Sequence, residues 1–272
     1  MDRLTLFWVL MAASALLFFA GVAANLSLWL EGKADRSGER SKWARLLSIG
    51  GTAVRGVSGR RFWLAVKAVL WDGLLHRALF REGKFRWLAH TSLALVFLPL
   101  FGLSTFTGFF EEILHLMFKV ETPFVLAVVN KDTPIMALLN EVAGLPLIFG
   151  LVAILVRRYL SRPAQLRTEG ADTSILVLLG IGLLTSYPTE ALRFLMEDTP
   201  ASLGSISFIG YPLAQIIKPL GLAWEQWHFA MFFAHVLPFM VLLVYMPWSK
   251  FFHVLVSPIV AAANSLRGEA VS

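Results

Sequence analysis

The sequence predicts an all-α integral membrane protein, a bundle of five transmembrane helices with one amphipathic helix at the membrane interface. Hydrophobic residues make up 57% of the 272 residues and charged residues only 15%, which is typical of a chain that lies mostly in lipid. Five long apolar runs are separated by charged or turn-forming segments. Lysine and arginine gather in alternate segments between these runs, which indicates membrane topology rather than a nucleic-acid partner.

The first apolar run starts at Leu4 and is too long for the core of a signal peptide, so we interpret it as the first spanning helix. Trp224 and Trp227, at the start of the last run, suit the aromatic belt of a membrane surface. The sequence shows no internal repeat, and residues 1–272 are interpreted as a single membrane domain. The expected spans cover residues 4–30, 87–110, 143–158, 174–195 and 224–256.

The loop after the first span, residues 31–86, is the most basic part of the chain, with thirteen Lys and Arg against five Asp and Glu. Within it, residues 61–80 set apolar side chains such as Trp63 against charged ones such as Lys67, as expected for a helix in the membrane interface that ends at His76. Nineteen of the 24 Lys and Arg fall on the side of this loop and four on the other side. We therefore expect a multi-pass protein of the cytoplasmic (inner) membrane, with its N-terminus outside and its C-terminus in the cytoplasm.

The absence of cysteine restricts the chemistry of the chain. It forms no disulfide and holds no thiolate metal site or iron–sulfur cluster of its own. Any redox role therefore requires a cofactor held by histidine. The chain has six histidines, and three of them lie in the last apolar run: His228, His235 and His253.

If the last run is one helix, His235 and His253 lie five turns apart on one face, with His228 on the same stripe. The rise between the first two is then roughly 27 Å, close to the thickness of the hydrocarbon core of a bilayer. A single histidine in a membrane helix can simply hydrogen-bond to another helix, but three on one stripe favour ligation. Haem suits neutral imidazole in an apolar pocket, whereas zinc is disfavoured because no compact set of four ligands appears.

Two more histidines are candidates for the opposite axial positions, because bis-histidine haem ligation normally joins two helices. His76 and His90 both belong to the cytoplasmic half of the protein, just before and on the second span. His76 has an alternative role in pairing with Asp72, one turn earlier. His115 and His228 should lie towards the outer surface, where either can hydrogen-bond a quinone or accept a proton.

Glu190 and Arg193 form a second constellation, at the outer end of the fourth span. Their spacing of three residues suits an ion pair that stabilises the end of a helix. The alternative is a quinol site, because the oxidation of a quinol releases protons that a carboxylate at the outer interface can accept.

A resemblance to a known family rests on five residues of the last apolar run, His235, Pro247, Ser249, Lys250 and His253. Their order and spacing resemble the last helix of the gamma (cytochrome b) subunit of respiratory nitrate reductase. The chain is more similar to the membrane subunits of heterodisulfide-reductase-like complexes, including the membrane cytochrome of the sulfite-reduction-associated Dsr complex. Residues 75–77 and 86–90 match that branch, as do Thr185, Glu190 and Arg193 in the fourth span.

The resemblance covers about residues 70–258 and departs from the nitrate reductase subunit at one place. That subunit has two histidines ten residues apart in its second helix, whereas here Leu100 follows His90 by ten residues. The second set of haem ligands therefore differs from that of the nitrate reductase subunit.

The resemblance implies a membrane cytochrome b with two haem b groups. Its ligand sets would be His253 with His76 nearest the cytoplasm and His90 with His235 deeper in the membrane, while a pairing of His90 with His253 stays open. Electrons would pass between menaquinol or menaquinone near the outer face and an iron–sulfur subunit on the cytoplasmic face, within a complex that has further membrane or periplasmic subunits. The basic residues 33–86 would form the docking surface, although binding to anionic lipid explains their charge equally well.

A function of another class is compatible with the same residues. In a cofactor-free membrane scaffold or transporter subunit, the histidines would be structural or would relay protons. The lack of inverted repeats in the sequence argues against a transporter.

Overall fold

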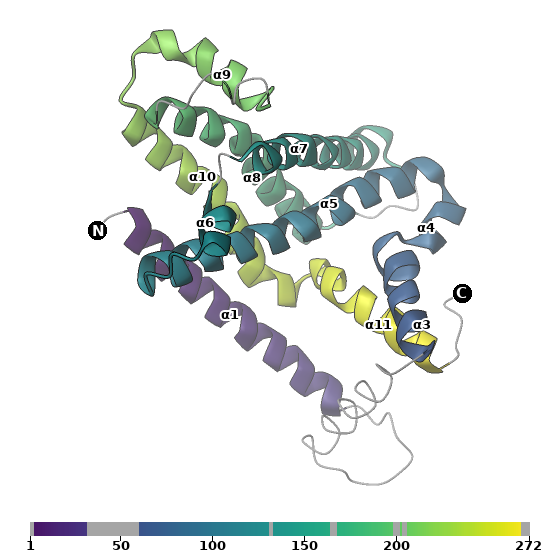
Figure 1. Cartoon of the computed structure of the whole chain (residues 1–272). Helices are drawn as coiled ribbons and strands as arrows, with labels where there is room; N and C mark the ends of the chain where they lie inside the picture. The colour runs from purple at the N-terminus through teal and green to yellow at the C-terminus, as the bar shows by residue number, and fades with distance from the viewer. Residues whose placement is uncertain are drawn as a thin grey trace. The chain divides into compact units, whose positions relative to one another are not determined.

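The computed structural model describes residues 3–31, 60–130, 133–163, 168–197, 202 and 206–267, and within these ranges every regular element is a helix (Figure 1). Five helices are long and apolar enough to cross a membrane: Arg3–Trp29, Lys84–Met117, Ala137–Ser161, Gly170–Met196 and Trp224–Trp248. The predicted class, an all-α protein with five helices of spanning length, is therefore confirmed. The chain is a multi-pass membrane protein. Half of the predicted basic loop, residues 32–59, lies outside the described residues.

The chain forms two compact units, each built from segments that are distant in sequence. The first unit comprises residues 1–87, 169–175 and 240–272. The second unit comprises residues 88–168 and 176–239. The last apolar run is divided between them, because residues 224–239 belong to the second unit and the residues from 240 onwards belong to the first.

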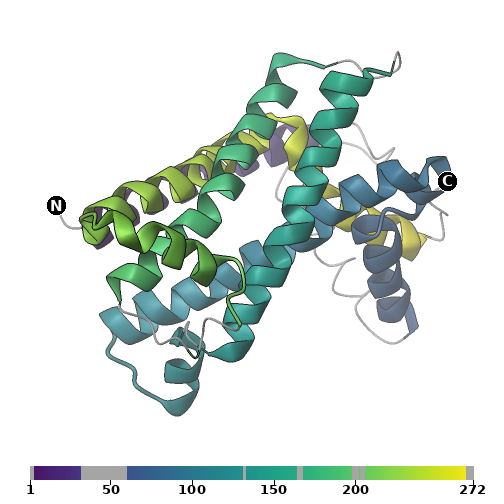
Figure 2. The same ribbon diagram turned by 90° about the horizontal axis from the view of Figure 1, so that it is seen from above.

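In the first unit, α11 (His253–Arg267) packs against α3 (Arg60–Ala68) and the π-helical turns η1 (Val69–Leu74), as both views show (Figures 1 and 2). The two elements approach closely at Gly73, where an added Cβ would lie 2.9 Å from the Cα of Pro258. The helix formed by α3 and η1 ends just before His76, as predicted, because the backbone of His76 is left-handed with φ of 49°. The helix expected over residues 61–80 is nevertheless divided, since α4 (Arg77–Glu82) starts after His76.

The second unit contains most of the long helices. It holds all of η2 (Phe109–Met117), α6 (Pro123–Val129), α7 (Pro134–Leu155), η3 (Val156–Ser161) and α9 (Gly210–Ile217). It also holds the larger parts of α5 (Lys84–Gly108), which η2 continues, α8 (Gly170–Met196) and α10 (Trp224–Tyr245). α5 and α10 contact each other through the rings of Phe97 and Phe239, whose centroids are 6.2 Å apart. α8 and α10 approach closely at Gly182, where an added Cβ would lie 2.6 Å from the ring of Phe239.

The last apolar run is not one continuous helix, so the prediction that His235 and His253 share a helical stripe is wrong. α10 ends at Tyr245, and the short 3₁₀ turns Met246–Trp248 and Lys250–Phe252 precede α11. Two local features break the helix. Pro247 has no N–H group to donate, and Ser249 is extended with φ of −124° and ψ of 167°.

The backbone exposed by this break is bonded within the first unit. The side-chain amide of Asn25, on α1 (Arg3–Glu31), donates hydrogen bonds to the carbonyl oxygens of Pro247 at 2.9 Å and Gly21 at 3.1 Å. Beyond the break, the rings of Trp29 and Phe252 lie 5.8 Å apart. Non-helical backbone at membrane depth requires such partners, because lipid offers none. The break is therefore a built feature of the fold.

Candidate functional site

His76 lies half-buried between η1 and α4, in a backbone conformation that few residues other than glycine adopt. Its Nδ1 atom donates a hydrogen bond to the carbonyl oxygen of Leu74 at 2.8 Å. The indole of Trp87 donates to the next carbonyl, that of Leu75, at 2.6 Å. These two bonds fix the tight turn and the orientation of the imidazole, and the first places the ring proton on Nδ1.

His253 is the first residue of α11, and its side chain is exposed. Its Nδ1 atom donates to the carbonyl oxygen of Lys250 at 2.5 Å. Burial lowers the pKa of His76, the hydrogen bond to Leu74 opposes this change, and the charge of His253 adds to the lowering. The two imidazoles of the first unit therefore lie within electrostatic range of each other.

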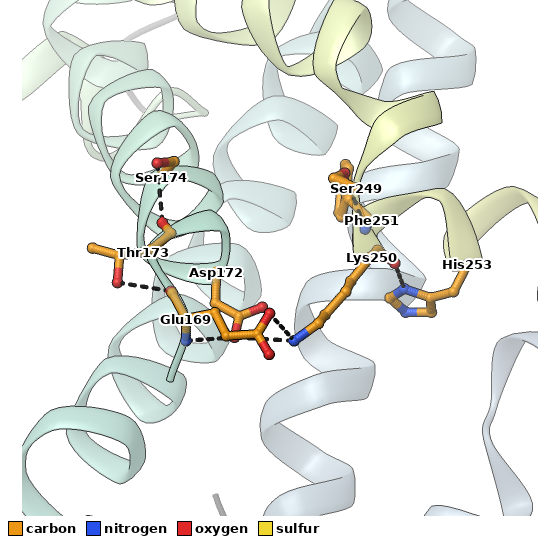
Figure 3. A network of polar contacts seen from close by, with 9 residues as sticks. Glu169, Asp172, Thr173, Ser174, Ser249, Lys250, Phe251 and His253 are labelled. Carbon is orange, nitrogen blue, oxygen red and sulfur yellow. Dashed lines mark hydrogen bonds and ion pairs between the residues drawn. The ribbon is translucent and has the colours of Figure 1, made fainter. Parts of the chain in front are cut away.

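A network of polar contacts surrounds the turn that precedes His253 (Figure 3). The ammonium group of Lys250 lies 2.8 Å from Glu169 Oε2 and 3.6 Å from Asp172 Oδ2, at the start of α8. The Oγ atom of Ser249 accepts a hydrogen bond from the backbone N–H of Phe251 at 3.2 Å. The Pro247, Ser249 and Lys250 pattern found in the sequence thus forms the turn that carries His253.

His235 lies in the middle of α10, in the second unit, and is half-buried. Its Nδ1 atom donates to the carbonyl oxygen of Gly182 on α8 at 2.8 Å. Its ring packs edge-on against that of Phe239, with centroids 5.4 Å apart. One turn earlier on α10, the carbonyl of Met231 accepts a hydrogen bond from Thr189 on α8 at 3.2 Å. The orientation of His235 therefore depends on the packing of α8 against α10.

His90 lies on α5, also in the second unit, and is half-buried with its Nδ1 atom enclosed by the protein. It precedes Phe97 by two helical turns, and Phe97 contacts Phe239, one turn after His235. The helices that carry His90 and His235 are thus neighbours.

Three of the four expected axial ligands share one arrangement, in which Nδ1 faces a backbone carbonyl. A hydrogen bond of this kind places the proton on Nδ1 and leaves the lone pair on Nε2, as is usual for histidines that bind metals. In the described ranges no three His, Asp or Glu side chains form a group that could hold a metal ion. Haem iron requires only two axial imidazoles, so these side chains suit it.

The structure also identifies a carboxylate that we did not select from the sequence. Glu141 on α7 is fully buried, with 0% of its surface exposed, and accepts hydrogen bonds from the backbone N–H groups of Gly210 at 2.8 Å and Ile209 at 3.1 Å. It thereby caps the first turn of α9. The sequence predicts that the third span starts at residue 143, two residues after Glu141. α7 begins earlier, at Pro134, a residue that favours the first turn of a helix.

Glu190 lies close to the same point. Its carboxylate packs against Gly210, where an added Cβ would lie 2.7 Å from Glu190 Oε2. One turn before it on α8, the hydroxyl of Tyr187 donates to the backbone carbonyl of Glu141 at 2.9 Å. We name Glu141, Tyr187, Glu190 and Gly210 the carboxylate cluster. A phenol and two carboxyl groups gathered at one point of the protein can take up and release protons.

Arg193 lies one turn after Glu190 and forms an ion pair with Glu197 at 2.7 Å. Its guanidinium also lies over the ring of Phe194, 4.9 Å from the centroid. The ion pair with Glu197 was not expected from the sequence, and a joint role of Glu190 and Arg193 stays a prediction.

The remaining two candidates differ in burial. His115 is half-buried in η2, and His228 on α10 is only 5% exposed, beside the ring of Phe232. The expected roles of His115 and His228 in binding a quinone or accepting a proton stay predictions. Isolated π-helical turns such as η2 are frequent at functional sites.

Comparison with known proteins finds a distant relative along nearly the whole chain. A component of the dihydromethanophenazine:CoB–CoM heterodisulfide reductase of Methanosarcina mazei, designated E, is 23% identical over 272 residues, which cover 94% of this chain and 91% of the relative. No family model and no solved structure matches the chain. The similarity supports the heterodisulfide-reductase-like branch of the resemblance and a role as a membrane subunit of a redox complex.

Proposed function

We propose that this chain is the haem b-carrying membrane subunit of a respiratory redox complex. It passes electrons between menaquinol or menaquinone and a cytoplasmic iron–sulfur subunit of the heterodisulfide-reductase-like type. The observation that carries the proposal is the shared arrangement of His76, His235 and His253, whose Nδ1 atoms each donate to a backbone carbonyl. The similarity to the heterodisulfide reductase of Methanosarcina mazei supports the type of complex.

The histidines supply two ligand sets, one in each unit. In the first unit, His76 and His253 would hold one haem, and in the second, His90 and His235 would hold the other. When bound, haem supplies reversible one-electron transfer. The hydrogen bond at Nδ1 fixes the plane of each imidazole and makes Nε2 a stronger ligand.

The carboxylate cluster is the proposed site of quinol oxidation. A menaquinol that is oxidised to menaquinone loses two electrons and two protons, and the protons need acceptors near the quinol. Glu190 and Glu141 serve as acceptors, and both contact Gly210 at the start of α9. The relative is named for dihydromethanophenazine, so a reduced phenazine is the second candidate donor for the same site.

The composition and the charge of this chain support an iron–sulfur subunit as its partner. The chain has no cysteine for a cluster, so the next electron carrier belongs to another subunit. Residues 60–86 are the described part of the basic docking surface, and their arginine and lysine side chains suit an acidic partner. We propose that this surface and the C-terminus lie in the cytoplasm and that the N-terminus lies outside.

The sidedness is tested by single cysteines at Ser37 and Ser202 in intact cells. Ser202 is exposed, whereas Ser37 lies outside the described residues. An impermeant thiol reagent should label the cysteine at 202 only. Labelling at 37 alone would reverse the topology.

The haem proposal is tested by a reduced-minus-oxidised absorption spectrum of the purified chain, with haem content measured per protein. We expect b-type bands, and a loss of about half the haem in His235→Ala and in His253→Ala, because each removes one of two axial ligands. His115→Ala serves as the control and should keep the full haem content. A chain without b-type absorption, or full haem retention in both ligand variants, would favour the cofactor-free scaffold or transporter subunit.

The quinol site is tested separately. Glu190→Gln keeps the size of the side chain but removes its ability to accept a proton. We expect slower haem reduction by a menaquinol analogue, with unchanged haem content. If reduction proceeds at the normal rate, and a substitution among the cytoplasmic-side residues blocks it instead, the quinol site lies at the inner face.

A further inference from the structure

The carbonyl group of Lys250 accepts two hydrogen bonds from one residue. His253 donates to it from Nδ1, at 2.5 Å, and from its backbone N–H at the end of the 3₁₀ turn. The direction of this carbonyl therefore determines how the imidazole of His253 is oriented. In Figure 3 the imidazole lies beside the backbone of Lys250, on the opposite side from the lysine side chain.

The side chain of the same lysine is held by two acidic residues. Lys250 Nζ contacts the carboxylates of Glu169, the residue before α8, and of Asp172, in the first turn of α8, and Figure 3 draws both contacts. The two acids are joined to each other, because the backbone N–H of Glu169 donates to Asp172 Oδ2 at 3.2 Å. Glu169 also accepts a hydrogen bond from Thr173 through its carbonyl, at 3.4 Å. The ammonium group of Lys250 thus contacts the carboxylates of two residues that are hydrogen-bonded to each other.

We propose that Lys250 is a positioning residue for His253, because its ion pairs with Glu169 and Asp172 hold the carbonyl that orients the imidazole. The backbone before Lys250 is extended at Ser249 and leaves α10, so the helix does not hold this carbonyl in place. The ion pairs of the lysine side chain, which we call the tether, and the Ser249 Oγ cap add their restraint to that of the 3₁₀ turn Lys250–Phe252. This inference rests on the proposed function, since it takes His253 as a haem ligand.

The ion pair of Lys250 with Glu169 contributes little to folding, which separates positioning from stability. The side chains of Lys250 and Glu169 are 59% and 61% exposed, and exposed pairs have small effects on the free energy of unfolding. From the sequence, Lys250 is expected to mark the inner end of the last span as a charge at the membrane interface. A lysine with that role alone would need no acidic partners on another element.

The test compares three variants: one removes positive charge, one removes negative charge and one keeps the charge. Lys250→Met and the double variant Glu169→Gln with Asp172→Asn both remove the tether, but the first removes positive charge and the second removes negative charge. Lys250→Arg keeps the charge and the ability to pair. Haem content, midpoint potential and the electron paramagnetic resonance spectrum of the oxidised protein are measured for each.

If Lys250 positions His253, both tether-free variants shift the same low-spin ferric signal in the same direction, and Lys250→Arg restores the original signal. The second low-spin signal stays unchanged. Opposite shifts of the midpoint potential with unchanged resonance signals would show that Lys250 acts only through its charge, and would overturn the proposal. Lys218→Met, which also removes an exposed lysine charge, is the matched control and should leave both signals unchanged.

A measurement on the unmodified protein gives a second readout. Salt weakens exposed ion pairs, so about 1 M sodium chloride should shift the same low-spin signal as Lys250→Met does. If His253→Ala keeps its full haem content, the proposed ligand role fails. If His253→Ala loses haem while the Lys250→Met signals match those of the wild type, the positioning role alone fails.

Discussion

His235 and His253 each donate a hydrogen bond from Nδ1 to a backbone carbonyl, but the two carbonyls come from different kinds of structure. His235 lies in a regular helix, and its carbonyl acceptor, Gly182, is 53 residues away in the sequence on another helix. His253 lies at a break between helices, and its acceptor, Lys250, is three residues away. One imidazole is therefore oriented by the packing of helices and the other by a local turn. Substitutions should affect the two in different ways, and this comparison can be tested.

The largest effect is expected at Glu141, because the second unit depends on contacts between distant segments. Glu141→Ala leaves the N–H groups of Ile209 and Gly210 without their acceptor, at a cost of about 1–3 kcal/mol for each group. Glu141→Gln keeps one acceptor oxygen and should lose about half as much. Thermal unfolding in detergent measures both variants. Equal stability of Glu141→Ala and the wild type would contradict the capping role.

Gly182→Ala tests the long-range route to His235 directly. The added Cβ would lie 2.6 Å from the ring of Phe239, so the helices α8 and α10 must separate, at about 1–3 kcal/mol. We expect haem to be lost from the His235 site and kept at the His253 site, as measured by haem content and resonance signals. Gly180→Ala is the control, because its Cβ makes an ordinary contact at 3.8 Å with Leu151. Equal loss in both variants would argue against a specific role of Gly182.

Asn25→Leu tests whether the turn before His253 also depends on a hydrogen bond from a residue distant in the sequence. The substitution removes the hydrogen bond to the carbonyl of Pro247, and such bonds between membrane helices contribute about 0.6 kcal/mol on average. A small fall in stability is expected, with the resonance signal of the His253 haem broadened and that of the His235 haem unchanged. A change in the His235 signal instead would contradict the division of roles between the two units.

The smallest effect on haem binding is expected for Ser249→Ala. It removes the Oγ atom that accepts from the N–H of Phe251, and losing a cap of this kind costs about 1 kcal/mol. Because the turn stays tethered by Lys250, full haem content and a slightly shifted His253 signal are expected. Ser265→Ala is a suitable control, since its hydroxyl donates to the carbonyl of Ala262 in the same helix. A complete loss of haem in Ser249→Ala would show that the cap outweighs the tether.

The sequence by itself determined the membrane class, the five helices of spanning length and the end of a helix at His76. These features depend on the hydropathy of single segments and on residues that are neighbours in the chain, so composition and periodicity are sufficient to predict them. The family resemblance also came from short local patterns, such as the Pro247, Ser249 and Lys250 turn. The roles of the histidines and of Glu190 stay predictions.

Only the tertiary structure decided that α10 ends at Tyr245, that Glu141 caps α9, and that His235 is oriented by Gly182. A spacing of eighteen residues between His235 and His253 is compatible with a straight helix, and Pro247 alone does not show whether a membrane helix kinks or ends. The break is stable because Asn25, 222 residues from Pro247, bonds to the freed carbonyl. Glu141 likewise finds its donors 68 and 69 residues away. In lipid every backbone polar group needs a protein partner, and the fold rather than the local sequence decides which distant residue provides it.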